Sequence, residues 1–70
     1  MNEVVHVTLN GEARALDPAL PLRDQLMAWG VRLDACAVAV DGVVVPRTRL
    51  GARHLRGGER IEVIRAVGGG

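Results

Sequence analysis

Two dipeptides that favour tight turns constrain the fold of this chain more than any other feature. Asn10-Gly11 follows a run rich in valine and precedes the weakly apolar Glu-Ala-Arg-Ala-Leu, and Asp41-Gly42 stands between two runs rich in valine. Such pairs supply the two positive-φ positions of a type I′ turn, which joins antiparallel strands through a two-residue loop. The sequence therefore predicts two β-hairpins, made of strands at 3–9 and 12–16, and at 36–40 and 43–45.

Between the hairpins the pattern changes to that of a helix. The segment 17–21 contains two prolines and breaks the first hairpin, and Pro21 suits the first position of a helix. Leu22, Leu26 and Trp29 then recur at helical spacing, and Gly30 follows as the C-terminal stop. We expect a helix of two to three turns, with Trp29 packed between helix and sheet.

The last apolar run, 60–67, predicts a final strand. Its alternation points Ile61 and Val63 to the core and leaves Glu62, Ile64 and Ala66 on the opposite face. The segment before it, 47–56, is polar, and we expect at most a short helical turn over 50–54.

These elements predict an α+β fold: a mixed sheet of about five strands with one main helix packed on one face. With 70 residues, the chain has room for one small domain. We assign residues 1–67 to that domain and 68–70 to a flexible glycine tail.

Composition excludes several classes of function. The net charge is +1, and Trp29 is the only aromatic residue, so the chain lacks the basic surface and stacking rings of a nucleic-acid-binding protein. All nine basic residues are arginine, which excludes catalysis through a lysine side chain. No apolar run of 18 residues and no basic leader are present. We therefore expect a cytoplasmic protein without membrane contact.

The remaining chemistry-bearing side chains are few. Cys36 with His6 and His54 falls short of a structural zinc set, so no metal site is predicted. A cysteine in an Ala/Val-rich strand is usually a small core residue, and we interpret Cys36 in this way. The two histidines, one on a strand and one in a loop, form no catalytic set.

Gly68, Gly69 and Gly70 are the most unusual feature of the sequence. Glycine loses the most conformational entropy on ordering and buries no side chain, so these residues add nothing to stability. They form a thin arm of about 10 Å, at roughly 3.3–3.6 Å per residue, that fits a slot too narrow for any Cβ. The arm carries an α-carboxylate, which needs activation, commonly by ATP. Because the chain has no phosphate-binding loop, a partner enzyme must supply the ATP chemistry. The chain is therefore predicted to be a substrate of enzymes, not an enzyme.

Several stretches together resemble the ThiS family, the ubiquitin-like sulfur carriers of thiamine biosynthesis. They are Val-Ala-Val-Asp-Gly-Val-Val-Val-Pro-Arg at 38–47, Gly-Gly-Glu-Arg-Ile-Glu-Val-Ile at 57–64 and Arg-Ala-Val-Gly-Gly-Gly at 65–70. With the early Asn-Gly hairpin and the short helix, the likeness spans nearly the whole chain. It departs from the family at the helix start, where Pro21 replaces a Ser/Thr cap, and at Trp29, usually aliphatic.

The resemblance implies a β-grasp fold and a defined role for the tail. An E1-like adenylyltransferase (ThiF) would adenylate Gly70 with ATP, so the carrier itself binds no cofactor. The adenylate would become a thiocarboxylate, with sulfur drawn ultimately from cysteine by a donor such as a cysteine desulfurase. Thiazole synthase (ThiG) would then receive the sulfur. Gly68 and Gly69 would be the residues by which the partner recognises the tail.

Ubiquitin-like proteins generally use the open face of the sheet for recognition. An exposed Ile64 needs an explanation, and we expect it to contact the adenylating enzyme together with Arg65 and Arg47.

Other functions remain open from the sequence. The same chemistry would serve a carrier for molybdopterin synthase, tRNA thiolation or cysteine synthesis, although the short chain and Asn-Gly hairpin favour the thiamine branch. A ubiquitin-like protein modifier would instead form isopeptide bonds through Gly70. In an interaction module the tail would be inert.

Overall fold

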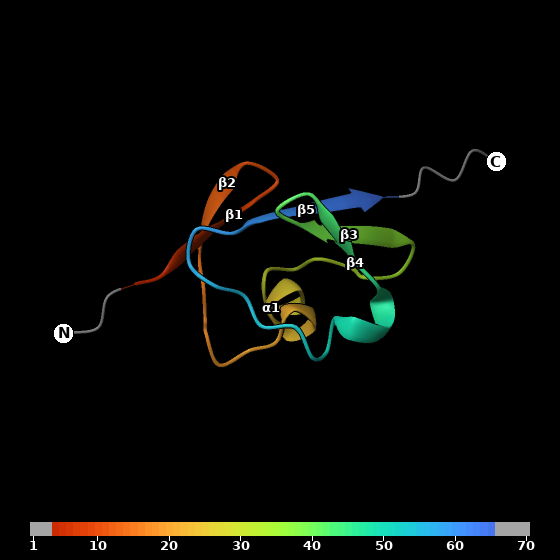
Figure 1. Cartoon of the computed structure of the whole chain (residues 1–70), viewed down its shortest axis with the longest axis horizontal. Coiled ribbons are helices and arrows are strands. Elements are labelled where there is room, and N and C mark those ends of the chain that lie inside the picture. Colours follow the sequence, from red (N-terminus) through yellow and green to blue (C-terminus); the bar gives the residue numbers. More distant parts are fainter. Residues whose placement is uncertain (1–3, 66–70) are drawn as a thin grey trace.

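The described residues, 4–65 of a computed structural model, place one α-helix across one face of a five-stranded mixed sheet (Figure 1). This confirms the predicted α+β architecture. The tail and residues 66–67 lie outside the described residues. In chain order the elements are β1 (His6–Leu9), β2 (Glu12–Ala15), α1 (Leu22–Ala28), β3 (Cys36–Val40), β4 (Val43–Val45), a 3₁₀ helix (Arg47–Arg49) and β5 (Arg60–Arg65).

Both predicted hairpins form through the expected turns. Asn10 and Gly11 have φ angles of 49° and 84°, and Asp41 and Gly42 have 49° and 81°. These paired positive values match a type I′ turn, whose twist suits the right-handed twist of the strands it joins. The turns fix the register of each hairpin: Leu9 pairs with Glu12 between β1 and β2, and Val40 pairs with Val43 between β3 and β4.

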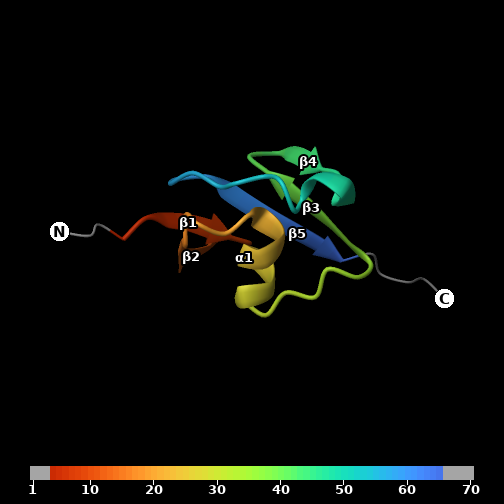
Figure 2. The same ribbon diagram turned by 90° about the horizontal axis from the view of Figure 1, so that it is seen from below.

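The last strand occupies the middle of the sheet, whose order is β2-β1-β5-β3-β4. β5 runs parallel to β1, with Leu9 opposite Ile61, and antiparallel to β3, from Val40↔Ile61 to Cys36↔Arg65. Figure 2 shows β5 passing between the two hairpins, with α1 on one side of the sheet. The C-terminal strand therefore joins two hairpins that would otherwise be separate.

The core lies between α1 and the sheet. Leu22 and Leu26 are fully buried on the helix, and Ile61 is 1% exposed on β5. Trp29 and Cys36 are partly buried against this cluster, in line with the core roles predicted for them. The other buried apolar residues of the cluster are Val7, Leu9, Leu16, Val38, Val40, Leu50 and Leu55.

The start of α1 differs slightly from the prediction. Pro21 is the N-cap, with an extended ψ of 163°, and not the first helical residue. No side chain caps the helix. Instead, carbonyls of the loop between the 3₁₀ helix and β5 do so: the amide of Leu22 donates to Arg53 O (2.6 Å), and that of Arg23 to Leu50 O (3.0 Å). These bonds satisfy amides that every helix leaves unpaired, which explains why a Ser/Thr cap is dispensable here.

The helix ends as predicted, at Gly30. Its φ is +82°, its amide donates to Met27 O (3.0 Å), and the amide of Val31 donates to Leu26 O (2.9 Å). This pair of bonds defines a Schellman motif, in which the left-handed residue is usually glycine. The motif turns the chain sharply toward β3.

Three predicted positions were wrong. The strand predicted over 12–16 ends at Ala15. The regular part of β1 begins at His6, not at Glu3. The short helical turn lies at Arg47–Arg49, not over 50–54. Pro46 starts this turn because its fixed φ suits the residue before a turn, and its carbonyl accepts from the amide of Arg49 (2.8 Å).

Candidate partner-docking site at the end of β5

The alternation of β5 presents one large apolar side chain to solvent. Ile61 is buried and Val63 packs partly against the core, as predicted. Ile64 lies on the opposite, helix-free face and is 57% exposed. An exposed isoleucine in the central strand contributes little to the core, so its place on this face favours a contact with another molecule.

The surroundings of Ile64 are small and apolar. Ala37 pairs with it on β3, and Ala39 lies two residues further along that strand. Val44, 63% exposed, pairs with Ala39 from β4. Because alternate strand residues share a face, these four side chains lie on one face, here called the open-face patch, although Ala39 is only 7% exposed and the charged Glu62 of β5 lies beside it on the same face. Of these four residues, only Ile64 was predicted from the sequence, although strand alternation in β3 and β4 places the other three on the same face.

Arg65 points to the other side of the sheet. It lies opposite Cys36, whose strand neighbours Val38 and Val40 are buried beneath α1. Its side chain borders a depression of about 260 Å³, lined also by Arg32, Asp34 and Ala35. Arg65 therefore flanks the root of the tail on the helix side.

Arg47 also lies on the helix side. It opens the 3₁₀ helix and donates a hydrogen bond from Nη2 to the carbonyl of Leu33 (2.5 Å). Arg47 and Arg65 thus both border the connection between α1 and β3, whereas Ile64 lies on the opposite face. The structure does not bring the three predicted docking residues onto one surface. Gly68, Gly69 and Gly70 lie outside the described residues.

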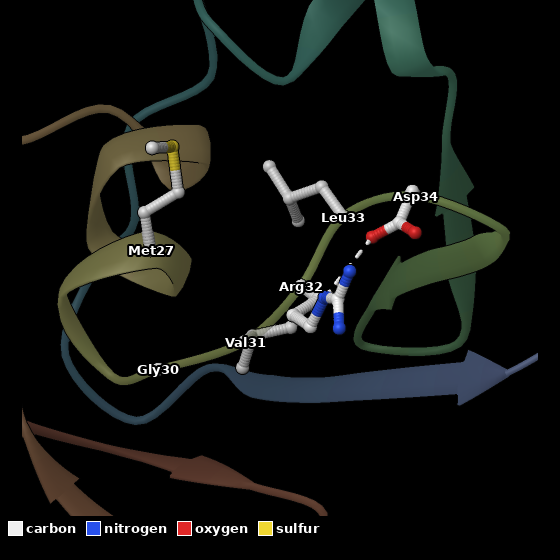
Figure 3. Close-up of a pocket in the computed structure, with 6 residues that line it drawn as sticks. All are labelled: Met27, Gly30, Val31, Arg32, Leu33 and Asp34. Atoms are coloured by element: carbon white, nitrogen blue, oxygen red, sulfur yellow. Dashed lines mark ion pairs between the residues drawn. The ribbon is translucent and has the colours of Figure 1, made fainter.

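The connection between α1 and β3 carries charges that the sequence analysis did not single out. Arg32 and Asp34 form an ion pair (3.6 Å) with both side chains largely exposed. Figure 3 shows this pair beside an open pocket of about 440 Å³ that Met27, Val31 and Leu33 line with apolar atoms. Arg32 and Asp34 come next to Arg65 only through the tertiary fold, so no short stretch of sequence predicts this neighbourhood.

The loop that leads into β5 is held by a different ion pair. Arg53 Nη2 and Glu59 Oε2 lie 2.7 Å apart, and the Glu59 side chain is 15% exposed. The hydrogen bond from Arg53 lowers the pKa of Glu59 below its ordinary value, against the opposing effect of burial. Glu59 also accepts from the amide of Arg56, so this carboxylate orders the turn before β5.

The described residues contain no reactive constellation. Cys36 Sγ donates to the carbonyls of Leu33 (3.3 Å) and Arg32 (3.5 Å), with no histidine among these partners. Within residues 4–65, no three His, Cys, Asp or Glu side chains are grouped closely enough to hold a metal ion. No helix in this part of the chain is long and apolar enough to cross a membrane. What the described residues present at the end of β5 is an exposed isoleucine on one face and Arg65 on the other.

The comparisons with known proteins agree with this picture. The ThiS family model matches residues 7–70. The crystal structure of thiamine biosynthesis protein ThiS from Geobacter metallireducens is similar, with a TM-score of 0.78 and 28% sequence identity. The similarity covers 93% of this chain and 99% of that one. No curated protein matches the sequence. The fold is therefore a ubiquitin-like β-grasp, and the chain belongs to the ThiS family, whose members are small sulfur carriers of thiamine biosynthesis.

Proposed function

We propose that this protein carries sulfur for the thiazole ring of thiamine as a thiocarboxylate on Gly70. The observation that carries the proposal is the family match, which extends through the final glycine. The fold supports it, because the strand that leads to the glycines is the central one, held by β1 at its start and by β3 as far as Arg65. The body thus offers a firm base from which a narrow arm enters another protein's active site.

The chemistry divides between the carrier and its partners. An E1-like adenylyltransferase would join the Gly70 carboxylate to the α-phosphate of ATP and release pyrophosphate. Sulfide would then displace AMP and leave the thiocarboxylate directly. Persulfide sulfur from a donor such as a cysteine desulfurase would instead displace AMP to form an acyl disulfide, and a thiol reductant would cleave its S–S bond to give the thiocarboxylate and a disulfide. Sulfur is a better nucleophile than the carboxylate oxygen it replaces, which suits transfer to thiazole synthase. ATP and the catalytic groups belong to the partners, so the carrier acts as a co-substrate.

The partner contacts are assigned to two surfaces. The open-face patch around Ile64 would provide apolar area, and Arg65 and Arg47 would meet acidic groups beside the tail. Apolar contacts of this kind supply affinity, whereas exposed charges mainly guide encounter and orientation. Gly68 and Gly69 would pass through a channel that excludes side chains.

Intact mass spectrometry tests the proposal. The chain is incubated with ATP, the adenylyltransferase and a sulfide source, beside a variant that lacks Gly70. We expect the full chain to gain the mass of sulfur replacing one oxygen and the variant to gain nothing. Added thiazole synthase with its substrates should return the mass to its starting value. An unchanged mass with an enzyme of proven activity would exclude the carrier role, and sulfur retained in the presence of the synthase would exclude the thiamine branch.

A further inference from the structure

One edge of β5 is left uncovered within the sheet. β1 pairs with β5 only at Thr8↔Arg60 and Leu9↔Ile61, whereas β3 continues along β5 as far as Arg65. The chain turns away from β5 at Asn10-Gly11. Within residues 4–65, the last part of β5 therefore has a neighbouring strand on one side only.

The hydrogen-bond directions identify which groups face the uncovered side. The amide of Asp41 donates to Arg60 O, so the backbone N–H and C=O groups of even-numbered β5 residues point toward β3. The amides of Thr8 and Asn10 donate to the carbonyls of Glu59 and Ile61, so the backbone N–H and C=O groups of odd-numbered β5 residues point toward β1. It follows that the amide of Arg65 and the carbonyl of Val63 point into the gap beyond the first hairpin.

The first of these odd-numbered amides already has a substitute for a strand. Asn10 Oδ1 accepts from the amide of Val63 (2.9 Å). This bond satisfies the amide of Val63, just beyond the point where β1 stops pairing. The next amide on that side belongs to Arg65, and no strand of the described residues lies opposite it. A depression of about 400 Å³ lies before this edge, at the start of β5, lined by Thr8, Asn10, Gly11, Arg60, Ile61 and Glu62.

The geometry points to strand addition: we propose that an extended segment of the adenylating enzyme pairs with β5 at Val63–Arg65. This rests on the proposed function. Unpaired amides and carbonyls at a sheet edge bind an extended chain through backbone hydrogen bonds, and alternate side chains provide specificity. Here one side of the added segment meets Ile64 on the open face, and the other meets Arg65 and Arg32 on the helix side. The matching segment carries an apolar residue toward Ile64 and a carboxylate toward Arg65.

Continuity with the tail selects this occupant over a second copy of the chain. The enzyme that receives Gly70 must hold the chain that directly follows β5, so its surface lies beside this edge whenever it reacts. Two copies paired antiparallel through the same edge would place both Arg65 side chains on one face of the pair, where like charges oppose association.

A proline at position 65 separates backbone pairing from side-chain contact. Arg65→Pro removes the exposed amide and adds a ring to the edge, while the bonds of β5 to β3 remain because they use even-numbered residues. Arg65→Ala removes the same side chain and keeps the amide. We expect Arg65→Pro to bind the adenylating enzyme at least 10-fold more weakly than Arg65→Ala, with both variants melting as folded domains. Equal affinities would overturn the proposal.

Amide hydrogen exchange on the unmodified chain gives a second readout that needs no variant. In the free protein the amide of Ile64, which faces β3, should exchange slowly and that of Arg65 quickly. Saturating adenylating enzyme should protect Arg65 by at least 10-fold. Protection that appears in the free protein as its concentration rises would assign the edge to a second copy and overturn the proposal. A wild-type chain that gains sulfur normally without this protection would reject strand addition alone, whereas one that neither binds nor gains sulfur would reject the proposed function as well.

Discussion

Asn10 and Val63 are separated by 53 positions in the chain and joined by one hydrogen bond, from the Val63 amide to Asn10 Oδ1 (2.9 Å). Asn10 also occupies a left-handed turn position, with φ 49°. A single side chain thus shapes the first hairpin and fastens the central strand to it. Asparagine suits both tasks, because it tolerates positive φ better than most residues and carries an acceptor.

Replacing Asn10 should separate these two tasks. Asn10→Gly keeps the turn but removes the acceptor, and we expect a loss of about 1 kcal/mol in the free energy of unfolding, the net value of one such hydrogen bond. Asn10→Ala adds the strain of a left-handed alanine, roughly a further 1 kcal/mol. Asn10→Asp, which keeps an acceptor, is the control. Urea denaturation measures all three, and equal stability of the Gly and Asp variants would contradict the role of the bond.

The Schellman motif predicts a contrast between two glycines. Gly30→Ala forces a side chain onto a residue with φ +82° and should cost about 1–2 kcal/mol, although no atom lies within 4 Å of the added Cβ. At Gly51 the added Cβ meets only the flexible end of Arg23, at 3.0 Å. Gly51→Ala should therefore cost less than Gly30→Ala in the same urea denaturation experiment. The reverse order would show that crowding, and not backbone conformation, limits these sites.

The Arg53–Glu59 pair predicts an acid-sensitive contribution to stability. The folded-state pKa of Glu59 is lowered from the ordinary 4.5, so the folded protein holds this proton less tightly than the unfolded chain. The stabilisation is complete above pH 4.5 and is lost as the pH falls through the lower, folded-state value. In the Glu59→Gln variant, the free energy of unfolding should decrease less steeply as the pH is lowered below 4.5. Arg53→Gln should reduce the slope in the same way, and a slope unchanged in both variants would remove the pair as the cause.

The open-face patch predicts a binding defect without a folding defect. Ile64→Asp changes a side chain that is 57% exposed, so the melting temperature should stay close to that of the wild type. Adenylation at limiting enzyme should fall by at least 10-fold, because a charge would be placed in an apolar contact. Val43→Asp is the matched control, since Val43 is 68% exposed but pairs with the buried Val40, on the face of the sheet away from Ile64. Equal rates for the two variants would place the docking surface elsewhere.

Local signals accounted for most of the fold. The turn pairs at Asn10 and Asp41 and the glycine stop at Gly30 depend on backbone conformations that few residues adopt, so short sequence stretches were enough to predict them. The position of the 3₁₀ helix was missed because Arg-Thr-Arg shows no apolar periodicity, and Pro46 sets its start. The carbonyls of Leu50 and Arg53 that cap α1 come from a distant loop and leave no trace in the sequence near Pro21.

The site was predictable to a smaller extent. The exposure of Ile64 follows from strand alternation, which needs only the sequence of β5. The separation of Ile64 from Arg65 and Arg47 depends on where the connection between α1 and β3 passes, and this is a tertiary property. The uncovered edge of β5 depends on the difference in length between its two neighbours, which was visible only once the pairings of β1 and β3 were known.

The central position of β5 also has a mechanical consequence. A pull on the C-terminal end acts along the axis of a strand that is bonded to β1 at its start and to β3 as far as Arg65. Such a load shears the lateral hydrogen bonds together, whereas a load on an edge strand can open them one after another. If an enzyme draws this terminus into its active site, as the proposed function requires, the load would fall on bonds that must break together, and the folded body would resist unravelling.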